Sequence, residues 1–490
     1  MKDIRHLTIF FCLALCIFLF GTQSHAQVPN ADSKITVDAS TRTEIVNALI
    51  GEMSAYYVFP DVAKKIESLL RKKLKEGRYN SVKYSADLAA ELTADLQKTS
   101  HDRHLRVMYS GVPIPVRGPD NQPSADEEAA TQERLKSFNY GIGTVERLPG
   151  NIGYLELRGF TPAKYSQKAV SAAMTQLADS AALIIDLRRN GGGDPTMVAL
   201  IAGYLFEKRT HLNDLYWREG QRIEEFWTDE NVAGPQYGIK KAIYVLTSKL
   251  TFSAAEEFAY DLKALKRATI IGEITGGGAN PGGDRRLSAN FSAFIPNGRA
   301  INPITKSNWE GTGVVPDVLV PSSNALLVAQ TVALKALSQG EKDPQKLQIL
   351  QEQQAELKGQ MALSASSLFG RQPIYLQGTM NTWGIRDELC PVNATSYGVD
   401  IALPPGLYEF KVGSRDFETI DYGANDNLRT YPWHGNTVMK QGGKNMLLEI
   451  SRAGVFTFKF DVKNPKRPAI SVVERTVPSG GSGQAAAGCR

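Results

Sequence analysis

Short apolar segments alternate with helical patterns from residue 153 to residue 334, and this alternation limits the possible folds more than any other feature of the sequence. Segments with the length of buried strands lie at 154–157, 182–187, 242–246 and 269–271. Helical patterns lie at 195–206 and 254–265. Strands that alternate with helices are typical of an α/β fold with a largely parallel sheet. We therefore predict an α/β core over residues 135–340.

The region before this core has a different pattern. Residues 35–105 carry helical patterns with apolar faces, such as Ile45, Leu49 and Met53. They predict an N-terminal helical bundle. The stretch 113–134 is rich in Pro, Asp, Glu and Gln, and it predicts an exposed connection between the bundle and the core.

The region after the core is divided by composition. Residues 345–360 are rich in Gln, Glu and Lys, which predicts a helical or flexible linker over 341–370. Short, regularly spaced strands are expected at 374–377, 406–412, 447–450 and 455–461. They predict an immunoglobulin-like β-sandwich over 371–476. The Gly-, Ala- and Ser-rich residues 477–490 predict a disordered tail.

The first 26 residues are typical of an export signal. Lys2 and Arg5 precede an apolar run, and the small residues Ser24 and Ala26 fit the cleavage rule. We therefore predict an exported protein, periplasmic or extracellular, without stable membrane insertion. Removal of the signal would lower the formal net charge from +5 to +4, which is too mild to indicate a nucleic-acid partner.

Cysteine and histidine are scarce in the predicted mature chain. Only Cys390 and Cys489 remain, so no disulfide framework is expected, and whether the two pair stays open. No metal-ligand spacing is present either, so neither a metal site nor a cofactor is predicted. The remaining histidines are His101, His104, His211 and His434.

Ser253 lies where a strand-like segment gives way to a helix-like one. At the first turn of a helix, the dipole and the free N–H groups can stabilise an oxyanion. The glycine run after segment 182–187 can bring further N–H groups close to a reacting carbonyl. One hydroxyl with two backbone donors indicates acyl transfer. A serine in this position is more often simply an N-cap.

His104 is the candidate general base. Leu105 and Val107 alternate after it and predict a strand that can join the α/β core. Glu310, in a turn-rich segment, is the candidate to orient the imidazole. Each has an ordinary structural interpretation as well, a satisfied buried histidine and a carboxylate that accepts backbone hydrogen bonds.

From about residue 38 to residue 334 the chain resembles peptidase family S41, which includes the tail-specific proteases, the tricorn core and interphotoreceptor retinoid-binding protein. The resemblance rests on motifs that occur in the family's order: Tyr56-Tyr-Val-Phe-Pro, Asp102-Arg-His-Leu, Asp186-Leu-Arg-Arg-Asn-Gly-Gly-Gly, Phe252-Ser-Ala-Ala-Glu-Glu, Ile271-Gly-Glu-Ile-Thr-Gly-Gly-Gly and Glu310-Gly-Thr-Gly-Val-Val-Pro-Asp. It implies a ClpP/crotonase-like α/β core. It also implies these roles: nucleophile Ser253, general base His104, orienting partner Glu310, and an oxyanion hole from the N–H groups of Ala254 and of Gly192 or Gly193.

Two departures separate this chain from the tail-specific branch. That branch has a lysine base downstream of the serine, whereas the corresponding region here, 275–279, contains none. That branch also carries a PDZ domain, for which segment 111–137 is too short and too polar. The resemblance therefore implies a serine endopeptidase of the Ser-His-Glu type that acts on proteins or peptides, and it gives no support for recognition of free C-termini.

The C-terminal region is similar to glycan-binding sandwich modules through its segments 375–384 and 404–413. This similarity implies that Trp383 and Trp433 stack on sugar rings, although tryptophans are more often core residues. Two other functions stay open. One is a catalytically silent S41-fold protein that binds apolar ligands, and the other is a scaffold tethered to glycan. The sequence does not indicate the substrate or the oligomeric state.

Overall fold

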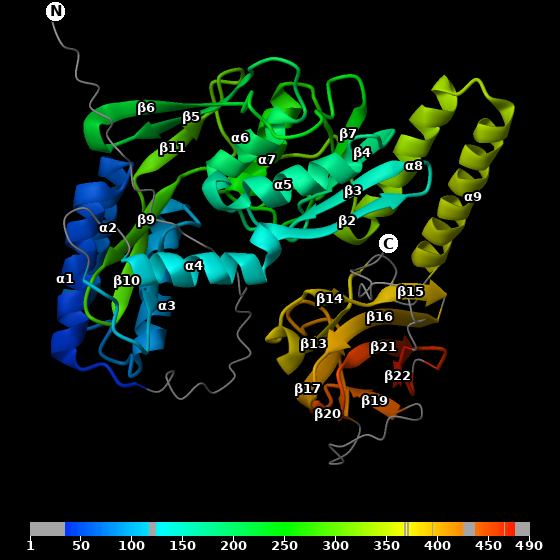
Figure 1. Cartoon of the computed structure of the whole chain (residues 1–490). Helices are drawn as coiled ribbons and strands as arrows, with labels where there is room; N and C mark the ends of the chain where they lie inside the picture. The colour runs from blue at the N-terminus through cyan, green and yellow to red at the C-terminus, as the bar shows by residue number, and fades with distance from the viewer. Residues whose placement is uncertain are drawn as a thin grey trace, which may run out of the picture.

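The computed structural model describes residues 35–116, 124–366, 369, 372–393, 395–424, 437–464 and 466–475. The predicted export signal, Trp433, Cys489 and the predicted tail lie outside these ranges, so those interpretations stay predictions. Figure 1 shows helices of the N-terminal region, a central α/β core and a C-terminal β-rich domain.

The N-terminal region contains three long helices, α1 (Ala39–Tyr56), α2 (Pro60–Lys75) and α3 (Ser85–Ser100). Asp38 caps α1 by accepting a hydrogen bond from the Thr41 N–H (2.7 Å). Pro60 begins α2, where its missing N–H would have no helical partner. α3 ends at His101, whose backbone is left-handed with φ 59°. The apolar faces of the helices share one buried cluster, which confirms the helical region expected here.

The core is built on a six-stranded sheet with the order β12-β8-β7-β4-β3-β2. Its strands are β2 (Ile142–Leu148), β3 (Ile152–Leu157), β4 (Ala182–Asp186), β7 (Ala242–Thr247), β8 (Thr269–Gly272) and β12 (Val318–Leu319). All neighbours pair in parallel except β2, which is antiparallel to β3. The predicted α/β fold with a largely parallel sheet is confirmed.

Helices cover both faces of this sheet. They are α5 (Ala163–Leu177), α6 (Pro195–Gly203), α7 (Ala254–Ala264) and α8 (Ser322–Gly340). Leu183 and Ile185 of β4 pack with α5, α6 and α7, whereas Ile184 between them packs with α8. Successive side chains of a strand point to opposite faces, so a strand covered on both sides must be apolar throughout. The carboxyl ends of β4 and β7 lie at one edge, where the chain turns into α6 and α7.

Two antiparallel three-stranded sheets flank the core, with the orders β1-β10-β9 and β11-β5-β6. Their strands are β1 (Arg106–Tyr109), β5 (His211–Trp217), β6 (Arg222–Trp227), β9 (Gly282–Arg286), β10 (Phe291–Pro296) and β11 (Gly298–Ile301). The strand after His104, β1, pairs with β10, which lies within residues 135–340 of the predicted core. The pairing is antiparallel and belongs to this flanking sheet rather than to the parallel sheet, and Leu105 and Val107 pack into the cluster of the N-terminal helices.

Half of the polar stretch predicted as an exposed connection forms helix α4 (Ala125–Ser137), a helix that the sequence analysis did not expect, and only Leu135 of this helix is buried. The Ser124 hydroxyl accepts a hydrogen bond from the Glu127 N–H (3.2 Å), and the Glu127 carboxylate accepts one from the Ser124 N–H (2.8 Å). This capping box, with acidic residues in the first turn, stabilises the helix start despite the polar composition. Short one-turn helices follow at Asn139–Gly141 and Glu219–Gln221.

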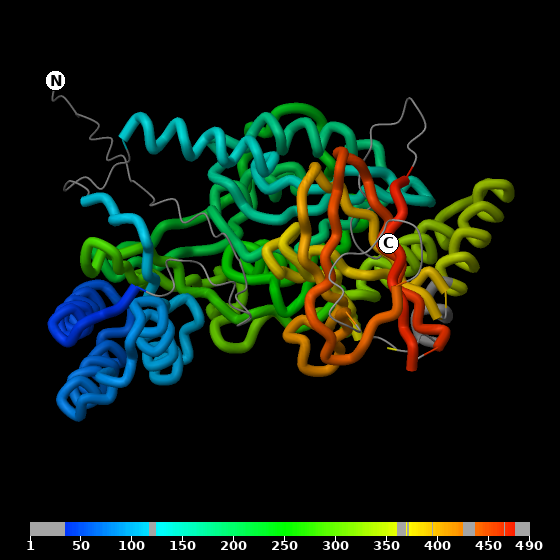
Figure 2. The backbone as a smooth tube through the Cα atoms, turned by 90° about the horizontal axis from the view of Figure 1, so that it is seen from below, coloured from blue at the N-terminus to red at the C-terminus, as the bar shows by residue number. Residues whose placement is uncertain are grey.

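The linker is helical, which is one of the two forms predicted for it. It forms α9 (Pro344–Ser366), which packs beside α8 through Leu350 and Leu357. Gln354 reaches across to the Ser338 hydroxyl (2.7 Å). The chain then enters the C-terminal domain, which lies away from the N-terminal helices in both views (Figures 1 and 2).

The C-terminal domain contains one ten-stranded sheet, with the order β14-β13-β17-β18-β19-β22-β21-β16-β15 and β20 beside β17. The strands are β13 (Tyr375–Gly378), β14 (Asp387–Glu388), β15 (Cys390–Asn393), β16 (Ser396–Leu403), β17 (Gly406–Gly413), β18 (Asp421–Ala424), β19 (Thr437–Gln441), β20 (Met446–Ile450), β21 (Gly454–Asp461) and β22 (Ala469–Glu474). The expected sandwich is thus a continuous sheet folded over one apolar cluster, because β18 and β19 join its two layers. Cys390 is disulfide-bonded, a point that the sequence leaves open.

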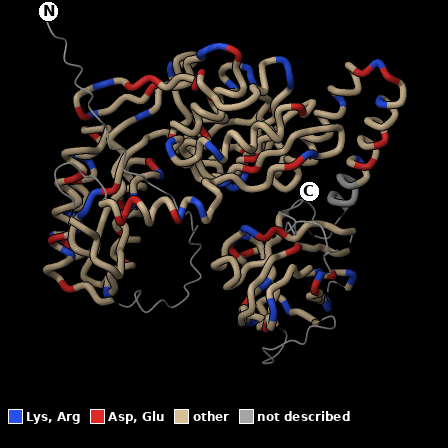
Figure 3. Tube along the Cα trace, in the orientation of Figure 1, with Lys and Arg blue, Asp and Glu red and all other residues tan. Residues whose placement is uncertain are grey.

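Charged residues of both signs are interspersed along the chain, without a long run of one sign (Figure 3). Within the described ranges, no helix combines the length and the apolar character that crossing a bilayer requires.

Candidate active site

Ser253 is held in an unusual backbone conformation between β7 and α7. Its φ of 55° and ψ of −127° are rare for a residue with a side chain and persist only where the surroundings enforce them. The Ser253 N–H donates to the Glu256 carboxylate (3.0 Å), and the Glu256 N–H donates to the Ser253 carbonyl (2.7 Å). The backbone of Ser253, rather than its hydroxyl, makes these capping contacts. In the described part of the chain the hydroxyl is therefore not used as an N-cap.

The glycine loop, residues 190–193, packs directly against Ser253. A methyl group on Gly192 would lie 2.7 Å from the Ser253 Cβ, and one on Gly193 would lie 1.9 Å from the Phe160 carbonyl oxygen. The φ angles of the two residues, 112° and 139°, also favour glycine. The close approach to Ser253 therefore requires glycine at position 192, and the close approach to Phe160 requires glycine at position 193.

Two backbone donors remain next to Ser253. The Gly192 N–H already donates to Asn190 Oδ1 (2.9 Å), so the donor role expected for Gly192 is occupied. The N–H groups of Gly193 and Ala254 donate to no acceptor within the described ranges. Ala254 begins α7, where the helix dipole adds positive potential. Both N–H groups therefore have unused hydrogen-bond capacity within the described ranges.

His104 is buried beside the residue that precedes the serine. Its side chain is 1% exposed, and its ring lies 4.5 Å from the Phe252 ring and 5.9 Å from the Phe294 ring, measured between centroids. A methyl group on Gly278 would lie 2.6 Å from its Cε1, so glycine there lets the loop before β9 approach the ring. Burial, and then the charges of Arg106 and Arg103, lower the pKa of His104 to about 3. The imidazole is therefore neutral at ordinary pH.

Glu310 lies in the same cluster as the imidazole. One oxygen from its carboxylate, one from Asp102 and a ring nitrogen of His104 all lie within 4.8 Å of one another. Glu310 Oε2 accepts the Ala279 N–H (2.5 Å), while its Oε1 is buried without a partner in the described residues. Burial, reinforced by the charge of Asp102, raises the pKa of Glu310 to about 8.

Asp102 is a residue of this cluster to which the sequence analysis gave no role. Its Oδ1 lies 3.7 Å from His104 Nδ1 and accepts the His104 N–H (2.9 Å). Its Oδ2 accepts hydrogen bonds from Asn280 (2.9 Å) and from the Tyr57 hydroxyl (3.2 Å). Burial raises the pKa of Asp102 and these donors oppose the rise. Its position two residues before His104 was the only available sequence signal.

Glu256 is a second residue without a predicted role. Its buried carboxylate accepts hydrogen bonds from the Thr275 hydroxyl (2.5 Å), from the N–H groups of Gly277 (2.6 Å) and Gly278 (2.8 Å), and from Ser253. Burial raises its pKa to about 7, and these hydrogen bonds act in the opposite direction. Glu256 thus fixes the loop after β8 to the start of α7.

The C-terminal domain contacts the glycine loop through the neighbouring arginines. The Arg189 guanidinium donates to the Arg386 carbonyl of that domain (2.8 Å). Burial raises the pKa of Glu388, and the charges of Arg188 and Arg189 oppose this rise, so the carboxyl group faces both arginines. Arg189 directly precedes Asn190, so the residue that the C-terminal domain binds is the sequence neighbour of the glycine loop.

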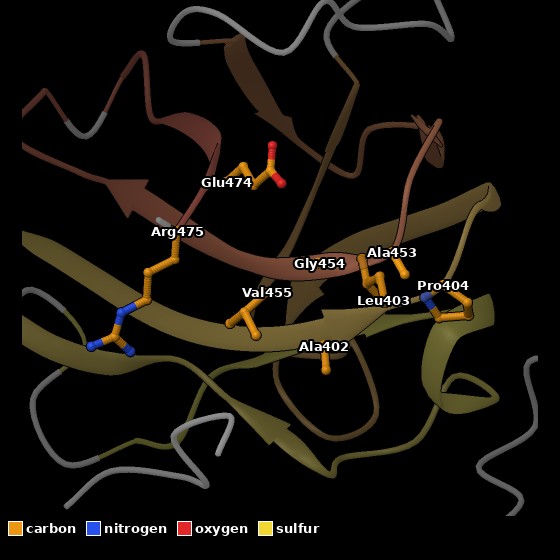
Figure 4. A pocket seen from close by; sticks show the side chains of 8 residues that line it. All are labelled: Ala402, Leu403, Pro404, Ala453, Gly454, Val455, Glu474 and Arg475. Atoms are coloured by element: carbon orange, nitrogen blue, oxygen red, sulfur yellow. The ribbon is translucent and has the colours of Figure 1, made fainter. Parts of the chain in front are cut away.

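Of the two tryptophans predicted to bind glycan, the described residues include Trp383. Trp383 is half-buried with a φ of 58°, and its backbone N–H donates to the Gly378 carbonyl (2.7 Å). Trp433 is outside the described ranges. Figure 4 shows a shallow pocket elsewhere on this domain, lined by Ala402, Leu403, Pro404, Ala453, Gly454, Val455, Glu474 and Arg475. Trp383 is not part of that pocket.

Two family models match this chain. Residues 151–320 match the model of peptidase family S41, and residues 31–138 match that of the N-terminal domain of the S41 peptidase in eukaryotic IRBP. The resemblance stated from the motifs is confirmed.

Several solved structures are similar in fold. The photosystem II D1 C-terminal processing protease is 18% identical, with 58% of this chain and 94% of that chain covered and a TM-score of 0.35. A lipoprotein from Streptococcus agalactiae is 14% identical, with 60% and 96% covered and a TM-score of 0.40. Mature CPAF is 11% identical, with 62% and 99% covered and a TM-score of 0.41. Similarity at this level carries no information on which residues act.

Proposed function

The chain belongs to peptidase family S41, and we propose that it is an exported serine endopeptidase that cleaves proteins or peptides with Ser253, His104 and Glu310. The observation that carries this proposal is the setting of Ser253. Its strained backbone presents a hydroxyl between a glycine loop that fits only without side chains and the first turn of α7. Strain of this kind is retained mainly where function needs it.

The reaction begins with attack of the Ser253 oxygen on a peptide carbonyl. His104 accepts the hydroxyl proton through the ring nitrogen that faces away from the carboxylates, and it later delivers that proton to the leaving amine. The Gly193 and Ala254 N–H groups donate to the oxyanion of the tetrahedral intermediate. Water then hydrolyses the acyl-enzyme with His104 again as the base.

The carboxylates stabilise the imidazolium that forms in each step. A buried imidazole with a pKa of about 3 is a poor base by itself, because its charged form has lost its hydration. An ionised Glu310 or Asp102 beside it offsets this loss. The proposed role of Glu310 is therefore electrostatic, and Asp102 shares it from the opposite segment.

One observation favours the catalytically silent alternative. Neither ring nitrogen of His104 has a hydrogen-bond partner in the described residues, so the imidazole and the Ser253 hydroxyl are not bonded here. Catalytic hydrogen bonds are often long in substrate-free proteins and shorten when substrate binds. The proposal thus requires the His104 ring and the Ser253 hydroxyl to come within hydrogen-bond distance when substrate binds, whereas a silent ligand-binding protein would not need this movement.

A fluorophosphonate test separates these two functions. The intact mass of the wild-type protein should increase by one adduct, and the increase should be absent in Ser253→Ala and strongly slowed in His104→Ala. His211→Ala is the matched control, since His211 is bonded to Asp214 (2.7 Å) far from Ser253 in sequence and should not alter labelling. Absence of an adduct on folded wild type would reject the peptidase proposal.

A further inference from the structure

Three groups that can bind a metal ion converge beside the His104 ring. A ring nitrogen of His104 and carboxylate oxygens of Asp102 and Glu310 lie within 4.8 Å of one another. Asp102 and His104 come from the turn between α3 and β1, and Glu310 comes from the loop between β11 and β12. The tertiary fold creates this cluster, which is why the ligand spacing in the sequence gave no indication of it.

A buried polar side chain without a partner lies in this cluster. His104 is 1% exposed, and neither of its ring nitrogens has a hydrogen-bond partner in the described part of the chain. Oε1 of Glu310 is in the same situation. A buried polar atom left without a partner destabilises the folded state. A cation that accepted these lone pairs would remove that destabilisation.

The donor set and its charges match one type of cation. A neutral imidazole nitrogen and two carboxylate oxygens are ligands of Zn²⁺, which binds them at about 2.0–2.2 Å. His104 Nδ1 and Asp102 Oδ1 are 3.7 Å apart, close to the separation of two ligands on one ion. Asn280 and Tyr57 hold the other oxygen of Asp102, as outer hydrogen bonds commonly orient metal ligands.

Two arginines lie near the cluster, each over an aromatic ring. The Arg103 guanidinium lies over the Phe252 ring (5.5 Å to the centroid) and donates to the Gly276 carbonyl (2.6 Å). The Arg106 guanidinium lies over the Phe294 ring (5.4 Å). Both arginines thus lie across an aromatic ring that itself contacts His104.

We propose that Asp102, His104 and Glu310 form a Zn²⁺ site whose occupation excludes catalysis. A metal ion on Nδ1 displaces any proton there, so the ring must carry its proton on Nε2. Nε2 is then a donor and cannot accept the Ser253 proton. Zinc binding stands independently of the proposed function, whereas the inhibition rests on it.

Zinc binding can be measured without peptidase activity. Isothermal titration of full-length Ser253→Ala protein with Zn²⁺ should show one ion per chain. Asp102→Asn and Glu310→Gln in this background should each weaken the affinity by at least about 10-fold, and His104→Ala should abolish it. His211→Ala removes the other histidine–carboxylate contact and should leave the affinity unchanged. Unchanged affinity in His104→Ala, or loss in His211→Ala, would overturn the site.

Inhibition is tested on the wild-type protein. Phosphonate labelling of Ser253 should slow by at least 10-fold with saturating Zn²⁺ and recover with EDTA, while Mg²⁺ should have no effect. Unaltered labelling under saturating Zn²⁺ would overturn the competition. If the wild type is not labelled at all, the proposed function fails, and the titration still decides whether the zinc site exists. Circular dichroism of each variant distinguishes lost ligands from lost folding.

Discussion

Two buried carboxylate networks lie near Ser253, and their hydrogen-bonding capacity is satisfied to different degrees. Glu256 accepts four hydrogen bonds, from Ser253, Thr275, Gly277 and Gly278. The network of Asp102, His104 and Glu310 keeps three buried atoms without partners in the described residues, both nitrogens of His104 and one oxygen of Glu310. A satisfied network stabilises one conformation, whereas unsatisfied groups retain capacity to bind a proton, a substrate or a cation. We infer that the first holds the nucleophile and the second does the chemistry.

Breaking the second network should have the largest effect on activity. His104→Ala is expected to lower kcat/KM by about 10⁴-fold, because the base of a triad acts as a unit with the nucleophile. Its free energy of unfolding should change by only about 1–2 kcal/mol. Peptide hydrolysis and urea denaturation of the same preparation measure the two values. A large loss of stability together with the loss of activity would instead indicate a structural histidine.

Breaking the first network should lower stability more, and activity less, than breaking the second. Glu256→Gln places an amide donor against backbone N–H groups that lose an acceptor, so unfolding should become easier by about 2–4 kcal/mol. Activity should fall by about 10–100-fold through displacement of the loop that contains Gly277 and Gly278. Urea denaturation and kcat measure these effects. Glu257→Gln is the matched neighbour, because that buried carboxyl does not contact the loop; equal kinetic loss there would contradict a positioning role for Glu256.

The stability of the second network should depend on pH. Burial raises the pKa of folded Glu310 from 4.5 to about 8, so between these values the folded state holds a proton that the unfolded state releases. Stability from this group therefore falls as pH rises through the window. The free energy of unfolding of Glu310→Gln, relative to that of the wild type, should therefore be about 2 kcal/mol higher at pH 9 than at pH 4. This value is reduced from the full effect of the pKa shift because the group is partly exposed. Equal denaturation midpoints for the variant and the wild type at both pH values would contradict this.

The pH dependence of activity gives the smallest effect and the sharpest comparison. Since the raised pKa keeps Glu310 protonated below about 8, kcat/KM should increase with pH through that region. His104, with a pKa of about 3, should not set an acid limb near 6 to 7. The acid limb of kcat/KM is therefore expected near pH 8, and not at about pH 6–7 where an ordinary histidine base would place it. The limb should move in Glu310→Gln, and an unmoved limb would assign it to another group.

The sequence predicted those features that local patterns determine. The alternation of strands and helices placed Ser253 between β7 and α7, and the glycine run placed Gly193 at the end of β4. The sequence named Glu310 as a partner for His104, from its turn-rich segment and from the resemblance, but it could not give their separation, because the two residues are far apart in the chain. Glu256 and Asp102 were missed since their partners, such as Thr275 and Asn280, meet them only in the folded state.

Where the sequence analysis fell short, long-range packing or an overlooked local signal decided. β1 joined the sheet of β10 because its apolar side chains face the N-terminal helices. α4 was overlooked although Ser124 and Glu127 have the spacing of a capping box. The single sheet of the C-terminal domain depends on which strand pairs with which, and short strands of similar composition do not encode that choice.

The bond from Arg189 to the Arg386 carbonyl has a consequence for any shortened version of this protein. A chain truncated before α9 would retain every residue of the proposed catalytic machinery. It would nevertheless lose the anchor of the residue that enters the glycine loop, and Arg188 and Arg189 would lose the carboxyl group of Glu388. We therefore expect Ser253 of the isolated peptidase region to react more slowly with the same reagents than Ser253 of the whole chain.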